Sequence, residues 1–191
     1  MGVFEYIVVL VSVIMGLGIT HLATGATKLI QNRDIVRFYI PHAIWTVNIL
    51  VHILLIWWGM FWWSNHSEWF AYQYLFITVY AIALFFLAAI LYPWDMDKDI
   101  DVQAYFFRNK QWFFGAMLVV WCVDIPETLV KASVDLRPVP PEYFWFIILL
   151  MGLASVGLAT RNYVVQLILP ILWFVLTLYY VMMTSLGQIS A

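Results

Sequence analysis

Residues 41–63 read PHAIWTVNILVHILLIWWGMFWW and contain no Asp, Glu, Lys or Arg. As a helix that rises about 1.5 Å per residue, this stretch is long enough to cross a hydrocarbon core of roughly 30 Å. Its second half carries Trp57, Trp58, Trp62 and Trp63, and tryptophan rings are typical of a membrane–water interface. The stretch therefore predicts a membrane-spanning helix whose tryptophan-rich end lies at one interface.

Apolar stretches of similar length recur along the whole chain. The predicted spans are 4–29, 41–63, 69–92, 111–130, 143–160 and 163–184. The chain is 65% hydrophobic and 10% charged, whereas soluble domains are roughly half apolar and about a quarter charged. We therefore predict an all-α, polytopic integral membrane protein. It would be one domain, 1–191, built as a bundle of six transmembrane helices with short loops, and the lipid bilayer would be its solvent.

The basic residues predict the orientation, because Lys and Arg are enriched in cytoplasmic connections. The first, third and fifth connections and their flanks hold Lys28, Arg33, Arg37, Lys98, Arg108, Lys110 and Arg161. The opposite side holds only Lys131 and Arg137. This bias predicts that both the N- and C-termini lie outside, and we expect a bacterial inner (cytoplasmic) membrane.

The composition also bears on partners. The formal net charge is −2 at pH 7 and there is no basic patch, which argues against a nucleic-acid partner. The first and fifth spans are rich in small residues, which favour close helix packing. A homo-oligomer or a larger membrane complex would suit such faces.

Several ionisable or polar groups fall inside the predicted spans, where they usually face a bundle interior or a water-filled cavity. His52 lies near the middle of its span, and Asn48 lies four residues before it on the same face. Asp124 and Glu127 lie toward the outside, and His21 lies toward the cytoplasm. These staggered depths predict a proton or ion path, with Asp124 as the outer acceptor, His52 as the midplane relay and His21 as the inner exit.

A structural role is the alternative for each of these groups. Asn48 and His52 would then hold neighbouring helices together by hydrogen bonds. Glu127 would pair with Lys131, four residues later, and Asp124 with a histidine or a hydroxyl group. Pro126, between the two carboxylates, removes one backbone donor and is expected to kink its helix.

A metal or cofactor site would draw on His21, His52, His42 or Cys122. The chain has no HExxH motif and no clustered Cys/His spacing. A haem held by two histidines needs ligands at matching depth, but His21 and His52 differ by roughly 8 Å along the membrane normal. The acidic run at 95–101 lacks the glycine and the final glutamate of a calcium loop. The sequence thus indicates no particular cofactor.

Three kinds of function fit these observations. The first is a small proton- or cation-handling transporter or channel, or a subunit of one. The second is a redox membrane subunit that binds haem, a metal, a quinone or a pigment. The third is an accessory or scaffolding subunit of a larger membrane complex. The sequence contains no P-loop, GxSxG or GxGxxG motif, so an enzyme is the less expected class.

Overall fold

The apolar stretches form helices in the computed structural model, which describes residues 2–95 and 100–189, with side chains as far as Thr184. Within these residues there are six α-helices and no β-strand, which confirms the all-α prediction. The helices are α1 (Val3–Gln31), α2 (Ile40–Gly59), α3 (Ala71–Leu91), α4 (Val102–Ser133), α5 (Tyr143–Ala159) and α6 (Tyr163–Ile189). A short 3-10 helix, η1 (Met60–Asn65), continues from the end of α2.

Five of these helices are long and apolar enough to cross a membrane; α5, with 17 residues, is shorter but also apolar. The observed helices match the predicted spans closely except at the start of α4. That helix begins at Val102, whereas the predicted span began at 111. Hydropathy underestimated its length because Arg108 and Lys110 make its first turns polar, although the helix runs through them. It also continues past Pro126 as one element.

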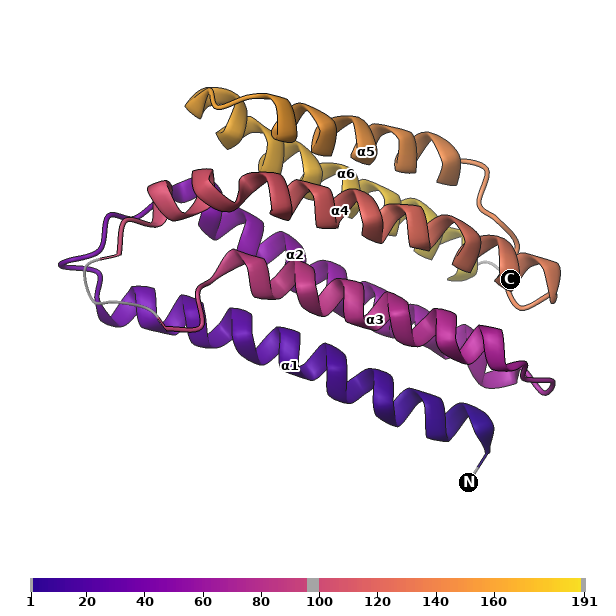
Figure 1. Ribbon diagram of the computed structural model, residues 1–191. Helices are drawn as coiled ribbons and strands as arrows, with labels where there is room; N and C mark the ends of the chain where they lie inside the picture. Colours follow the sequence, from indigo (N-terminus) through magenta and orange to yellow (C-terminus); the bar gives the residue numbers. More distant parts are fainter. Residues whose placement is uncertain (1, 96–99, 190–191) are drawn as a thin grey trace.

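The six helices pack in two layers (Figure 1). α1, α3, α4 and α5 lie side by side in that order, and α2 and α6 lie together behind them. Consecutive helices run in opposite directions, as short connections favour. The start of α1 and the end of α6 therefore lie at the same end of the bundle, on the right in Figure 1.

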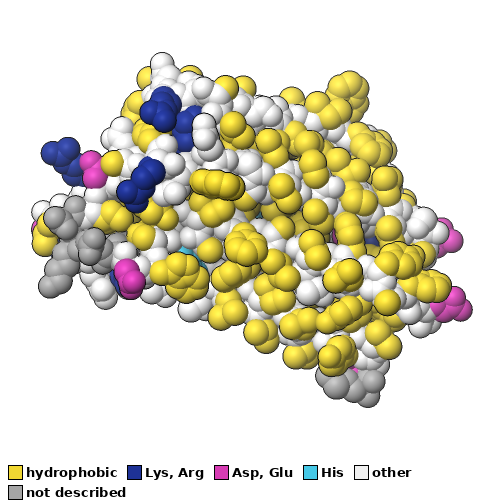
Figure 2. All heavy atoms as spheres, viewed as in Figure 1, with side chains coloured by type: hydrophobic (Ala, Val, Ile, Leu, Met, Phe, Trp, Pro, Cys, Tyr) yellow, Lys and Arg dark blue, Asp and Glu magenta, His cyan; other side chains and the backbone are white. Residues whose placement is uncertain are grey.

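The two ends of the bundle differ in their side chains (Figure 2). The basic end comprises the α1–α2, α3–α4 and α5–α6 connections with their flanks. Its described basic residues are Lys28, Arg33, Arg37, Arg108, Lys110 and Arg161. The tryptophan end comprises η1, the α2–α3 and α4–α5 connections, Trp57, Trp58, Trp62, Trp63 and Trp69, and its basic residues are Lys131 and Arg137. Lys98 and the middle of the acidic run, 96–99, lie outside the described residues.

Two glycines allow helices to approach closely near the basic end. A Cβ atom built at Gly25 would collide with the ring of Tyr92, and one built at Gly157 would collide with the ring of Phe114. Small residues let helices pack through van der Waals contact in a membrane, where the hydrophobic effect does not drive helix association. The small-residue faces of α1 and α5 thus serve packing at these positions.

Lys110 ties α4 to the end of α5. Its side chain is only 3% exposed, and its Nζ donates hydrogen bonds to the carbonyl oxygens of Gly157 (3.2 Å), Leu158 (2.7 Å) and Thr160 (2.9 Å). The last carbonyls of a helix have no partner within the helix and carry partial negative charge. A buried cation here satisfies those carbonyls, so its role is structural.

Candidate functional site

A cavity of about 190 Å³ opens among α2, α3, α4, α5 and α6 toward the tryptophan end. Its polar lining includes Asp124, Glu127 and Lys131 from α4, and His52 from α2. The rest of the wall combines aliphatic, proline and hydroxyl side chains with seven aromatic ones: Trp58, Trp62, Tyr80, Trp121, Tyr143, Phe146 and Tyr180. Three of the five residues predicted for an ion path, Asp124, His52 and Glu127, therefore line one cavity.

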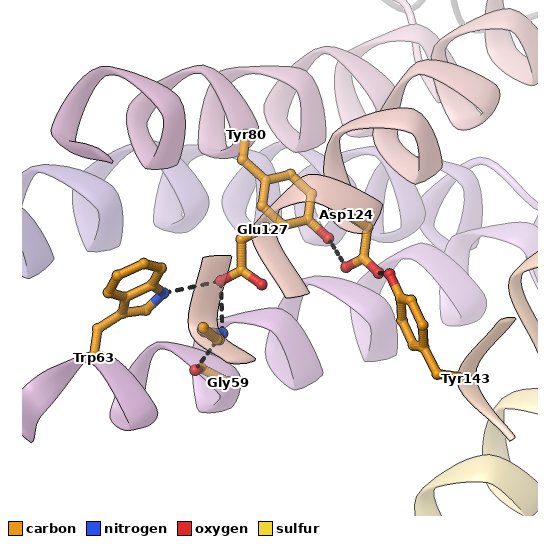
Figure 3. Close-up of polar contacts among 7 residues, drawn as sticks. Gly59, Trp63, Tyr80, Asp124, Glu127 and Tyr143 are labelled. Atoms are coloured by element: carbon orange, nitrogen blue, oxygen red, sulfur yellow. Dashed lines mark hydrogen bonds and ion pairs between the residues drawn. The ribbon is translucent and has the colours of Figure 1, made fainter. Parts of the chain in front are cut away.

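Asp124 is held by two tyrosines from neighbouring helices (Figure 3). The Tyr80 hydroxyl on α3 donates to Oδ1 at 2.6 Å, and the Tyr143 hydroxyl on α5 donates to Oδ2 at 2.7 Å. Both oxygens thus accept a charge-assisted hydrogen bond, which suits an ionised carboxylate. Within the described part of the chain, no Lys, Arg or His lies within ion-pair distance of this carboxylate.

Glu127 lies one turn further along α4 and has a different environment (Figure 3). Its Oε1 lies 2.6 Å from Nζ of Lys131 and accepts the indole N–H of Trp63 at 2.9 Å. Lys131 also donates to the carbonyl of Gly59, at the end of α2. The pair that the i, i+4 spacing predicted is confirmed. Glu127 and Lys131 neutralise each other, and they fasten α4 to α2 and η1.

His52 lies at the inner part of the cavity. Its ring packs edge-on against Trp121 with 4.7 Å between ring centroids, and Trp121 precedes Asp124 by about 4.5 Å along α4. His52 is 7% exposed, and neither of its ring nitrogens has a hydrogen-bond partner among the described residues. Buried polar groups nearly always have such a partner, so this ring is unusual.

Thr177 on α6 repeats this feature. Its side chain is 5% exposed and lines the same cavity, and its hydroxyl has no hydrogen-bond partner in the described structure. The cavity therefore joins one carboxylate without a direct ion pair to two buried polar side chains without hydrogen-bond partners among the described residues. Together these groups offer a cation acceptor and several hydrogen-bond positions.

Asn48 does not contact this cavity. Its Nδ2 donates to the carbonyls of Ile44 and Pro170, at 3.0 and 2.9 Å, and so bridges α2 to α6. Asn48 and His52 share a helix face, as predicted, but the structure shows no hydrogen bond between them. For Asn48 these contacts favour the structural interpretation.

The other two predicted histidines lie toward the basic end. His21 donates through Nε2 to the carbonyl of Tyr92 at 3.0 Å, and its ring lies 4.6 Å from that of Trp94. It lines a second cavity of about 200 Å³ between α1 and the end of α3. His42 donates through Nε2 to the carbonyl of Leu91 at 2.7 Å. Both rings thus bond to carbonyls at the end of α3.

The residues considered for a metal are dispersed. Cys122 is exposed on α4, and His21, His42 and His52 occupy the separate environments described above. Among the described residues, no group of three or more His, Cys, Asp or Glu side chains is placed to hold a metal ion.

Four residues of the site had not been singled out from the sequence: Tyr80, Tyr143, Thr177 and Arg137. Tyrosines in an apolar stretch resemble interfacial anchors, and a threonine in a membrane helix usually bonds to its own backbone. Only the packing of α3, α5 and α6 around α4 shows which of these side chains reach the cavity.

Comparisons with protein families, with curated proteins and with solved structures found no match for this chain.

Proposed function

We propose that this protein is a small proton- or cation-handling transporter or channel, or a subunit of one, in a bacterial inner membrane. In this proposal all six helices span the membrane, the basic end faces the cytoplasm, and both termini lie outside. α5 contributes about 26 Å of helix, close to the roughly 30 Å of a hydrocarbon core. The cavity at the tryptophan end then opens to the outside.

The observation that carries the proposal is the contrast between the two carboxylates of α4. Glu127 has its own lysine at 2.6 Å, whereas Asp124 has two hydroxyl donors and no cation within ion-pair distance in the described structure. A carboxylate inside a membrane is costly and is retained mainly where it binds something. A proton or another cation that enters the cavity would supply the missing charge.

His52 is the next group along the proposed path, since it lines the inner part of the same cavity and has two ring nitrogens without partners. A neutral imidazole has one nitrogen that accepts and one that donates, so it can take up a proton on one side and release it on the other. His21, in the second cavity, would be the exit group.

The two cavities share no lining residue. The side chain of Ile53, the neighbour of His52, lies 3.6 Å from the position that a Cβ atom would take at Gly18, one turn before His21 on α1. In this proposal, transport through both cavities would require the packing between them to rearrange. A channel with a continuous water path would not need such a movement, which makes the transporter the stronger form of the proposal.

The test is cation-dependent flux in proteoliposomes, measured with an internal pH dye and with potassium or sodium gradients. Asp124→Asn and His52→Ala should each lower the flux at least tenfold, while both variants keep the thermal melting temperature of a folded protein. Asp135→Asn is the matched control, because it removes an exposed carboxylate at the same end of the molecule. Full flux in both cavity variants would overturn the proposal.

A second candidate function is the binding of a cofactor, and the aromatic wall beside the free nitrogens of His52 favours it. The ring could ligate a metal centre or donate to a quinone oxygen. An absorption spectrum and a metal analysis of protein purified gently from its own membrane distinguish this candidate. A Soret band, a carotenoid band or a stoichiometric metal would replace the transport proposal with this one.

A purely scaffolding role is the least supported of the three classes. In a scaffold, every buried polar group would be expected to bond within the protein, as Asn48 and Lys110 do. Buried polar atoms without partners also occur elsewhere in the described structure, for example on Tyr39 and Trp45, but only His52 and Thr177 combine this feature with a position in the cavity beside Asp124.

A further inference from the structure

The chemistry of the cavity also indicates a class of ligand. Four residues with formal charge at neutral pH line it: Asp124, Glu127, Lys131 and Arg137. Glu127 and Lys131 form an ion pair. Asp124 and Arg137 are each without an ion-pair partner among the described residues, and they do not pair with each other. The cavity therefore holds one negative and one positive side chain that have no ion-pair partner within 4 Å among the described residues.

These two groups come from different elements. Asp124 lies on α4 and is fixed from both sides by Tyr80 and Tyr143. Arg137 lies in the α4–α5 connection, beyond the last turn of α4, where its guanidinium packs 5.2 Å from the ring centroid of Trp62. The negative group thus lies within the helical bundle and the positive group lies in the connection at its end. A molecule that enters from the tryptophan end would meet Arg137 first.

The wall between them suits an organic ammonium group. Aromatic rings from six elements line the cavity, including Trp58, Trp121 and Tyr180, and the faces of such rings attract alkylammonium cations. A metal ion would instead need several oxygen or nitrogen ligands, and the described residues offer no such cluster. A cavity of roughly 150 Å³ can hold a molecule the size of benzene, so about 190 Å³ admits a small organic ion.

We propose that the cavity binds a small zwitterion, an amino acid or a betaine, with its ammonium group at Asp124 and its carboxylate toward Arg137. Such a ligand compensates both charges at once and adds no net charge to the membrane interior. The hydroxyl of Thr177 and the ring of His52 remain available for further polar atoms of the ligand. This inference rests on the proposed cation-handling function, with the ammonium group as the cation at Asp124.

The experiment measures binding by isothermal titration to the full chain in nanodiscs, with two matched pairs of probes. Glycine betaine is compared with choline, which keeps the trimethylammonium group without the carboxylate. L-valine is compared with isobutylamine, which keeps the primary amine without the carboxylate. At least one zwitterion should bind tenfold or more tightly than its matched amine. Acetate alone should bind no better than choline.

Two variants assign the two ends of the ligand. Arg137→Gln should remove the preference for the zwitterion and leave the binding of the amine unchanged. Asp124→Asn should weaken both members of the pair at least tenfold. Arg33→Gln is the control, because Arg33 is an exposed arginine at the basic end. Both cavity variants should keep the wild-type melting temperature, which shows that they are folded. Arg137→Lys keeps the positive charge and should therefore retain part of the preference for the zwitterion over its amine.

The outcomes separate this inference from the proposed function. If both amines bind as tightly as their zwitterions, or if Arg137→Gln leaves the preference for the zwitterion unchanged, the proposal of a zwitterionic ligand is wrong. Flux of protons or inorganic cations that depends on Asp124 would then still support the proposed function. If no probe binds while such flux is observed, the inference fails alone. If neither probe binding nor flux depends on Asp124, both fail.

Discussion

Polar side chains near the two ends of this bundle offer a comparison, because one set bonds to backbone carbonyls of another helix and the other set does not. At the basic end, Lys110, His42 and His21 each bond to carbonyl oxygens at or just beyond the end of a helix. At the tryptophan end, Asp124 and His52 line a cavity, and no other helix's backbone bonds to them. Helix ends present carbonyls that need donors, so a buried donor there completes the fold. Polar groups that line a cavity instead remain available to something that enters it.

This comparison predicts that substitutions of Lys110 and His42 cost stability, whereas substitutions of Asp124 and His52 mainly affect binding or transport. The largest loss of stability should come from Lys110→Met. The variant keeps most of the apolar stem but leaves three carbonyls at the end of α5 without their charged donor. Hydrogen bonds to charged groups contribute roughly 1.5–3 kcal/mol, so we expect a loss of about 3 kcal/mol in the free energy of unfolding.

Unfolding in mixed detergent, followed by circular dichroism, measures this loss. Lys28→Met is the control, since Lys28 lies at the same end but is only partly buried. A Lys110→Met protein as stable as the Lys28→Met protein would show that the lysine is not structural, and the contrast between the two ends would fail.

A smaller effect is expected at Gly157, whose carbonyl bonds to both Lys110 and Gln166. Gly157→Ala would place a methyl group against the ring of Phe114, so either this buried ring or the two helices must shift. Overpacking of this kind costs roughly 1–3 kcal/mol. Gly152→Ala, on the same helix with nothing near its Cβ position, should be neutral or slightly stabilising. Equal melting temperatures for the two variants would refute the close-packing argument.

The sequence predicted much of the fold because each helix is marked by its own hydropathy. It also predicted the pairing of Glu127 with Lys131, since that contact depends only on the geometry of one helix. It missed the first turns of α4, where Lys110 is compensated by carbonyls that lie 47 or more residues away in the chain. The residues around Lys110 in the sequence do not indicate such a distant partner.

The site was harder to predict than the fold for the same reason. Asp124 and His52 stood out because ionisable groups are rare in apolar stretches. Their neighbours did not, because Tyr80 and Tyr143 reach Asp124 only through the packing of α3 and α5 on α4. Arg137 looked like an ordinary basic residue of a connection until the fold placed it at the cavity. The sequence therefore indicated which polar groups lie within apolar helices, but it did not indicate their partners.

The smallest predicted effect gives the sharpest comparison, because it uses one substitution at two positions of α2. His42→Phe removes the donor to the Leu91 carbonyl and should lower the free energy of unfolding by about 1 kcal/mol, the usual contribution of a neutral hydrogen bond. His52→Phe removes no hydrogen bond, and the adjoining cavity leaves room for the ring, so stability should stay the same or rise. The same detergent unfolding assay measures both. If His52→Phe were the more destabilising of the two, His52 would have a structural role. The proposed distinction between His42, which bonds to a helix end, and His52, which is available to a ligand in the cavity, would then be wrong.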